Sequence, residues 1–79
     1  MLIDFKIIET PVFGNITITA DTQINNLMAD EVVVAEKVTV RLFGTIEKTL
    51  VLKEKSIVIF HGTINGEIIN EGGELIQYK

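Results

Sequence analysis

The sequence contains no cysteine and a single histidine, His61, so neither a disulfide framework nor a structural zinc site can stabilise this 79-residue chain. A chain of this length forms one domain and buries only about 60% of the surface that its unfolded form exposes. Small domains without disulfides or metals commonly gain stability from a partner chain. We therefore expect a single domain, residues 1–79, that forms a homo-oligomer.

Positive charge and long apolar runs are also scarce. Seven Lys and Arg stand against eleven Asp and Glu, which gives a net charge of −4, and the basic residues form no cluster of the kind that binds nucleic acid. No apolar run approaches the roughly 20 residues needed to cross a bilayer. The first residues lack the basic region and small-residue cleavage site of a signal peptide. We expect a cytoplasmic protein without a transmembrane segment or a nucleic-acid partner.

Residues suited to catalysis are few. His61 is the one residue of a type that can act as an acid or base at neutral pH, and Ser56 is the one serine. Neither a Gly-x-Ser-x-Gly nucleophile nor a phosphate-binding glycine motif occurs. Glu36 and Glu54, each followed by a lysine, could bind a hard cation or serve acid–base chemistry, but solvated charges at a corner account for them more simply. We expect no enzyme, and no catalytic, cofactor or metal site.

What the sequence does contain is an internal repeat, which is the mark of a fold built from stacked units. Residues 32–49 and 50–67 share seven identical positions, among them a Gly-Thr-Ile block at 44–46 and 62–64. From Ile16 onward, apolar residues occupy the even-numbered positions over much of the chain, and strand side chains alternate between two faces. A repeat with an even number of residues places the even-numbered side chains inside on every turn. The pattern predicts an all-β fold, a short parallel β-solenoid (β-helix) with about 18 residues per turn.

Interruptions of this parity recur at the repeat spacing and predict three bends per turn. One column of bends contains Asn26, Gly44 and Gly62, residue types that tolerate positive φ. Between the bends, equivalent side chains of successive turns should stack about 4.8 Å apart in the interior. The expected inner columns are Val32/Leu50/Ile68, Val34/Leu52/Asn70, Val40/Val58/Ile76, Ile24/Leu42/Phe60/Tyr78 and Met28/Ile46/Ile64.

Residues 14–79 are expected to form the repeats, with turns at 14–31, 32–49 and 50–67 and a partial turn at 68–79. Residues 1–13 include the one proline and no repeat pattern, and should cap an open end or pair with a neighbouring strand. Gly72-Gly73 marks where the parity fails and the solenoid should end. The pair Asn65-Gly66 favours a two-residue hairpin turn, so an antiparallel β meander or sandwich is the alternative fold.

The two complete turns share a pattern that continues into the partial turn: Val40-x-Leu42-x-Gly44-x-Ile46, Val58-x-Phe60-x-Gly62-x-Ile64 and Asn70-x-Gly72. Over roughly residues 32–75 this pattern resembles the cores of the bactofilins, bacterial cytoskeletal proteins whose short parallel β-solenoids polymerise end to end. The resemblance implies the solenoid fold and a structural, self-associating role.

Several apolar residues are expected to point outward and to mark a partner surface, because aligned exposed apolar residues are typical of interfaces. We expect a lateral interface at Val33, Phe43, Val51, Ile57, Ile59 and Ile69. The sequence thus favours a non-catalytic scaffold module that self-associates. The alternative is a small adaptor or inhibitor that binds another protein through this apolar stripe, unless the N-terminal segment folds back over it.

Overall fold

The structure is a computed structural model and describes residues 5–78. Every regular element in this range is a β-strand, as expected for segments rich in Val, Ile and Thr. The strands are β1 (Lys6–Ile8), β2 (Val12–Ile18), β3 (Thr22–Val34), β4 (Thr39–Leu52), β5 (Ile57–Ile64), β6 (Glu67–Asn70) and β7 (Glu74–Tyr78).

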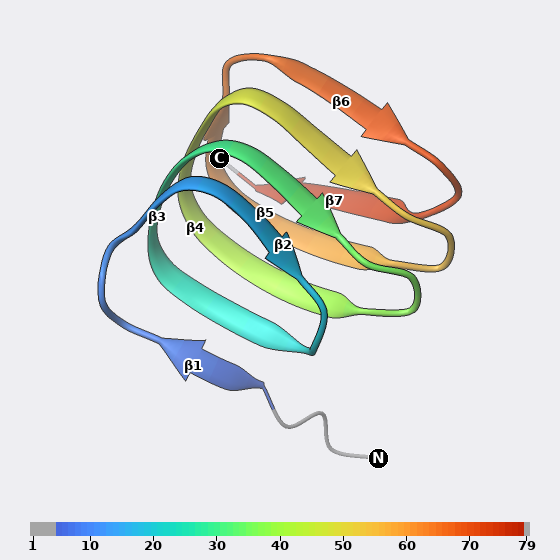
Figure 1. The fold of residues 1–79 in the computed structure, drawn as a ribbon, viewed down its shortest axis with the longest axis horizontal. Helices are drawn as coiled ribbons and strands as arrows, with labels where there is room; N and C mark the ends of the chain where they lie inside the picture. Colours follow the sequence, from blue (N-terminus) through green and yellow to red (C-terminus); the bar gives the residue numbers. More distant parts are fainter. Residues whose placement is uncertain (1–4, 79) are drawn as a thin grey trace.

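All strand pairs are parallel and stack one lap of the chain on the next. The strands follow the order β1-β3-β4-β5-β7, with β2 also paired to β3 and β6 to β4. Figure 1 shows the chain winding as a solenoid from the N-terminal lap to the C-terminal lap. Thr39 lies opposite Ile57, which is the spacing of the sequence repeat. The predicted parallel β-solenoid is thereby confirmed, and the antiparallel alternative is wrong.

Bends in each lap divide the solenoid into three faces, which we call A, B and C in the order that the chain visits them. Within the described residues, face A has five strand segments, and faces B and C have four each. Face A contains β1, residues 22–24, 39–43 and 57–61, and β7; face B contains residues 12–14, 27–29, 44–46 and 62–64; face C contains residues 15–18, 31–34 and 49–52, and β6.

The core is a set of apolar columns, aliphatic apart from Phe60, that run along the inside of the solenoid. Val32 and Leu50 are paired and fully buried, as are Val40 and Val58, which agrees with the expected columns. Burying each Val or Leu side chain stabilises the fold by about 1.5–3 kcal/mol. Within residues 5–78 each lap presents inward side chains to those of the next lap, so the interior is continuous along the axis.

Met28 points outward, contrary to the expectation that it joins the core. Three residue steps separate Ile24 from Leu27 in β3, whereas two separate their partners in β4, so β3 carries a β-bulge. The extra residue reverses the parity of the segment that follows. Leu27 and Ala29 are therefore fully buried and Met28 is 57% exposed.

Two expected columns change as a consequence of this bulge. The partner of Gly44 is Leu27 rather than Asn26, and the residue paired with Ile46 is Ala29 rather than Met28. A second irregularity between Ala29 and Glu31 restores the repeat spacing before face C. Face C therefore keeps its expected inner columns.

The last lap is one residue shorter than expected. Val58 pairs with Leu75 and Phe60 with Gln77, so Ile76 and Tyr78 face outward rather than into the core. The parity does fail at Gly72-Gly73, but the solenoid does not end there, because β7 continues face A beyond this point.

The first lap begins earlier than the repeat pattern indicated. Lys6 pairs with Thr22 and Ile16 with Val32, so this lap is shorter than the sequence repeat and β1 and β2 together visit all three faces once. A first turn over residues 14–31 is therefore wrong. β1 pairs with β3 and forms the N-terminal edge of face A, and residues 1–4 of the expected cap lie outside the described residues.

Candidate interaction surfaces

The six residues expected to form one lateral stripe lie on two different faces. Val33, Val51 and Ile69 are aligned on the outside of face C, each paired with the next. Val33 and Val51 are half-buried by their neighbours, and Ile69 is exposed. Thr17 extends this column at the N-terminal end. Face C thus carries a narrow aliphatic column one residue wide.

The other three residues lie on face A. Ile57 is exposed, whereas Ile59 and Phe43 are half-buried. Ile59 pairs with Ile76, which the sequence pattern had placed inside. Face A therefore carries a second apolar surface near its C-terminal edge, and the corner at residues 35–38 and 53–56 separates it from the column on face C.

An aromatic ladder crosses face A beside these isoleucines. The rings of Phe43 and His61 stack with centroids 4.5 Å apart and planes at 10°, and those of His61 and Tyr78 at 4.7 Å and 11°. These spacings match the distance between neighbouring strands. The sequence pattern placed Phe43 outside, but it wrongly placed Tyr78 inside, because the shortened last lap is not visible in the repeat.

His61 thus lies in the middle of this ladder. Its ring is sandwiched between two aromatic rings, and its neighbours across the sheet are Phe43 and Tyr78 rather than a carboxylate that could orient it as a general base. This environment suits a packing role.

The charged corner between faces C and A is a pair of stacked turns. Val38 N–H donates to the Ala35 carbonyl at 3.3 Å, and Ser56 N–H donates to the Lys53 carbonyl at 3.1 Å. The third residue of each turn is a lysine with positive φ, 63° at Lys37 and 61° at Lys55. This is the geometry of a type II turn, which favours glycine at that position.

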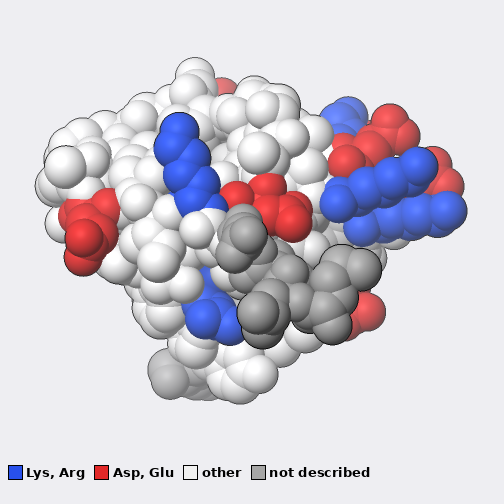
Figure 2. All heavy atoms as spheres, turned by 90° about the horizontal axis from the view of Figure 1, so that it is seen from below, with Lys and Arg blue, Asp and Glu red and all other residues white. Residues whose placement is uncertain are grey.

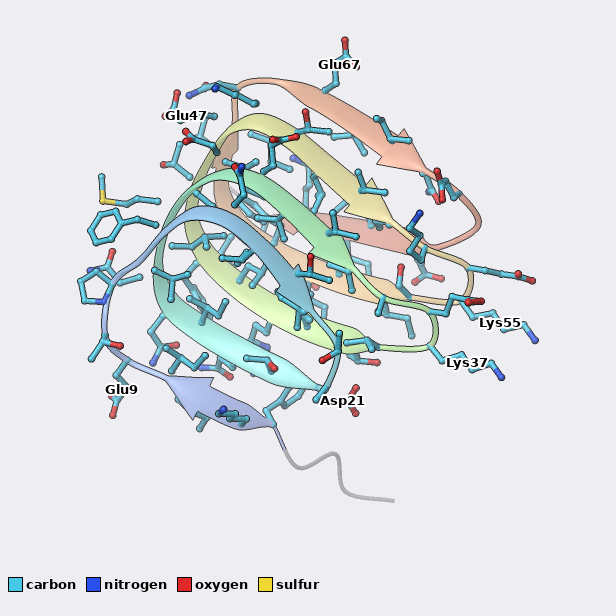
Figure 3. The ribbon with its side chains drawn as sticks, in the orientation of Figure 1. Glu9, Asp21, Lys37, Glu47, Lys55 and Glu67 are labelled. Carbon is cyan, nitrogen blue, oxygen red and sulfur yellow. The ribbon has the colours of Figure 1, made fainter. Side chains whose placement is uncertain are left out.

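The charges of this corner are solvated. Lys37 and Lys55 extend away from the molecule side by side (Figure 3), and acidic and basic side chains gather at the same corner in Figure 2. Lys53 and Glu71 form an exposed ion pair of 2.9 Å, which contributes at most about 1 kcal/mol. Within residues 5–78, no group of three or more His, Asp or Glu side chains could hold a metal ion.

The N-terminal end of the solenoid is hollow. Ile8, Val12, Ile16 and Ile18 line a depression of about 250 Å³, and Lys6 lies among the lining residues. Ile8, Val12 and Ile16 are only partly buried because no lap of the described chain lies beyond them. This end presents the apolar interior of the first lap.

The C-terminal end is the second place where the interior is open. Residues 62–64, β6 and β7 are each paired along one side only within the described chain. Ile68, on an inner column, is 43% exposed, and Ile64 and Leu75 are partly buried. Backbone N–H and C=O groups and apolar side chains are therefore presented together at this end.

Comparison with known protein families, curated proteins and solved structures found no match to this chain. Over residues 5–78 the structure holds no helix long and apolar enough to cross a membrane.

Proposed function

We propose that the chain is a non-catalytic structural module that self-associates through the open ends of its solenoid. The observation that carries this proposal is the C-terminal end, where three strand segments have one unpaired side and Ile68 and Tyr78 are 43% and 51% exposed. The bactofilin-like sequence pattern favours the same role, because those proteins assemble end to end.

Unpaired strand edges invite pairing with another chain, and proteins that remain monomeric protect such edges with charges, proline, bulges or covering segments. β7 carries little protection of this kind. It has five residues, no proline and no bulge, and Glu74 is its one charged residue. Leu75 and Ile76 would be removed from water if another chain paired with this edge, which would add a hydrophobic contribution to the backbone hydrogen bonds.

Light scattering across a concentration series tests the proposal with two matched variants. Ile68→Arg places a charge on the open end, and Val51→Glu places one on the outside of face C, away from both ends. We expect the wild type and Val51→Glu to associate and Ile68→Arg to remain monomeric, with circular dichroism showing that both variants are folded. An assembly that Val51→Glu dissociates and Ile68→Arg leaves intact would show that association is lateral instead.

A second role is favoured by the aligned column of Val33, Val51 and Ile69 on face C. This surface would suit a small adaptor or inhibitor that binds another protein. A wild-type chain that stays monomeric at all concentrations would support this role over self-association.

A further inference from the structure

The number of strand segments fixes how a second copy can continue the solenoid. The first and the last strand of the described residues, β1 and β7, both lie on face A, so the next free positions after β7 lie on face B, then face C, then face A. The first lap of the chain supplies three consecutive segments, namely residues 6–8, 12–14 and 15–18. Three free positions at one end thus correspond to three segments at the other.

We infer that copies of this chain associate head to tail, each rotated by about 120° relative to the last, so that face A of one copy continues face B of its neighbour. This inference rests on the proposed self-association and adds its geometry. Residues 5–78 form thirteen strand segments, which make four and one-third laps of a three-faced solenoid. At about 4.8 Å per lap, each copy would advance the assembly by roughly 21 Å.

The lengths of the segments suit this arrangement. β1 and residues 62–64 each have three residues, and residues 15–18 fit along the five residues of β7. Each pairing would satisfy the unpaired backbone N–H and C=O groups of both edges, whose burial without partners would be costly.

The inward side chains of the two ends also match, when each strand keeps the same residues pointing inward. In the rotated arrangement Ile8 of one copy lies over Ile64 of the other, Val12 over Ile68, and Ile16 over Leu75. All six side chains are now exposed or only partly buried at the two ends. On the outside, Phe13, which is 64% exposed, lies over Ile69, which is 41% exposed. On the same inner columns, Ile18 lies over Gln77 and Lys6 lies over Gly62.

In an unrotated head-to-tail stack, the strand positions and the inward side chains of the two joined ends match poorly. Placing β1 of one copy on β7 of the other keeps face A continuous, but it leaves one strand position empty on face B and one on face C. It also brings Lys6 over Leu75 and Ile8 over Gln77, because both pairs occupy the same inner columns as Thr22 and Ile24. Lys6 points inward in both arrangements, but the rotated stack places it over Gly62, whereas the unrotated stack places it over a leucine and also places Ile8 over a glutamine, which is unfavourable.

Pairs of cysteines introduced into this cysteine-free chain distinguish the arrangements. Thr17, Ile7 and Ile76 all point outward, so their replacement leaves the core intact. In the rotated stack Thr17 of one copy lies beside Ile76 of the next, and in the unrotated stack Ile7 takes that place. Within one chain, four strand spacings separate Ile7 from Ile76, and Thr17 lies on another face, so a short bis-maleimide cannot join either pair internally.

We expect the Thr17→Cys/Ile76→Cys variant to give a ladder of covalent multimers on a denaturing gel. The Ile7→Cys/Ile76→Cys variant should give none, and the single Ile76→Cys variant should give no covalent dimer. A ladder from the Ile7 pair would show unrotated stacking, and a dimer from Ile76→Cys alone would show tail-to-tail pairing. Either result, or an assembly that none of the variants cross-links, would overturn the rotation while leaving self-association in place. Light scattering on the same variants without cross-linker shows whether they are assembled or monomeric. Variants and wild type that are all monomeric would overturn both proposals.

Discussion

At the scale of single residues, Gly62 lies where two laps of backbone approach closely. Its φ is 138°, and a Cβ atom there would collide with the carbonyl oxygen of Gly44. Gly14 also has positive φ, 80°, but a Cβ atom would meet nothing within 4 Å. The two positions therefore separate the effect of backbone conformation from the effect of a steric clash.

We expect Gly62→Ala to lower the free energy of unfolding by about 2–4 kcal/mol, because it adds the clash to the strain of an L-residue at positive φ. Gly14→Ala should cost only about 1 kcal/mol, from the strain alone. Urea denaturation followed by circular dichroism at low protein concentration measures both. Equal losses of unfolding free energy in the two variants would show that the steric clash at Gly62 does not add to the cost of the substitution.

Lys55 is a residue whose conformation is unfavourable for its type. Its φ of 61° places it in the left-handed region, which glycine adopts without a steric penalty. We expect Lys55→Gly to raise the free energy of unfolding by about 0.5 kcal/mol, since relief of strain slightly exceeds the added entropy of the unfolded chain. Glu54→Gly, one position earlier in the same turn, has no positive φ to relieve and should be destabilising. A melting temperature that is higher for Glu54→Gly than for Lys55→Gly would contradict the type II geometry.

These residues also show what sequence reasoning can detect. Gly44 and Gly62 could be predicted as bends because glycine that recurs at the repeat spacing within a strand pattern marks a bend or a close approach of backbone. The positive φ of Lys37 and Lys55 could not be predicted, because lysine has no preference for that conformation and the contacts of the stacked turns impose it.

At the scale of elements, the bulge in β3 decides which of two adjacent residues is buried. Leu27 is fully buried and Met28 is 57% exposed. We expect Leu27→Asp to lose more than about 3 kcal/mol by placing an unpaired charge in the core, and Met28→Asp to change stability by less than about 0.5 kcal/mol. Chemical denaturation of both variants tests the bulge directly. A large loss of stability in Met28→Asp with a small loss in Leu27→Asp would contradict the bulge and would show that Met28 lies in the core.

Parity predicted the inner residues wherever the laps keep the spacing of the sequence repeat, as on face C. It failed for Met28 and for Ile76 because one residue is added in the corner at Asn25 and Asn26 and one is missing near Gly72. A single residue in a corner reverses every side chain in the strand that follows. Corner lengths depend on contacts between laps, which an alignment of the repeats does not contain.

At the scale of the whole molecule, the bends decide which outward residues share a surface. Val51 and Ile57 were expected in one stripe because both are outward and apolar. The corner between them turns Val51 onto face C and Ile57 onto face A. The open ends were foreseeable in any short solenoid, but the unequal number of strands on the three faces became visible only with the register of every pair.

The net charge of −4 on each copy predicts how assembly should respond to salt. Copies stacked roughly 21 Å apart repel one another over the Debye length of about 30 Å at 10 mM salt, and much less over the roughly 8 Å at 150 mM. We expect the association constant to rise several-fold between these two conditions in light scattering. A fall would indicate that ion pairs between copies, rather than apolar and backbone contacts, hold the assembly together.

Sedimentation velocity of the wild-type chain over a wide concentration range tests self-association through the open ends most directly. We expect species heavier than the 8.8 kDa monomer, with an average mass that continues to rise with concentration because head-to-tail addition leaves an open end on every assembly. A plateau at the dimer would keep self-association but exclude head-to-tail growth. A single species of 8.8 kDa at every concentration would contradict the proposed function.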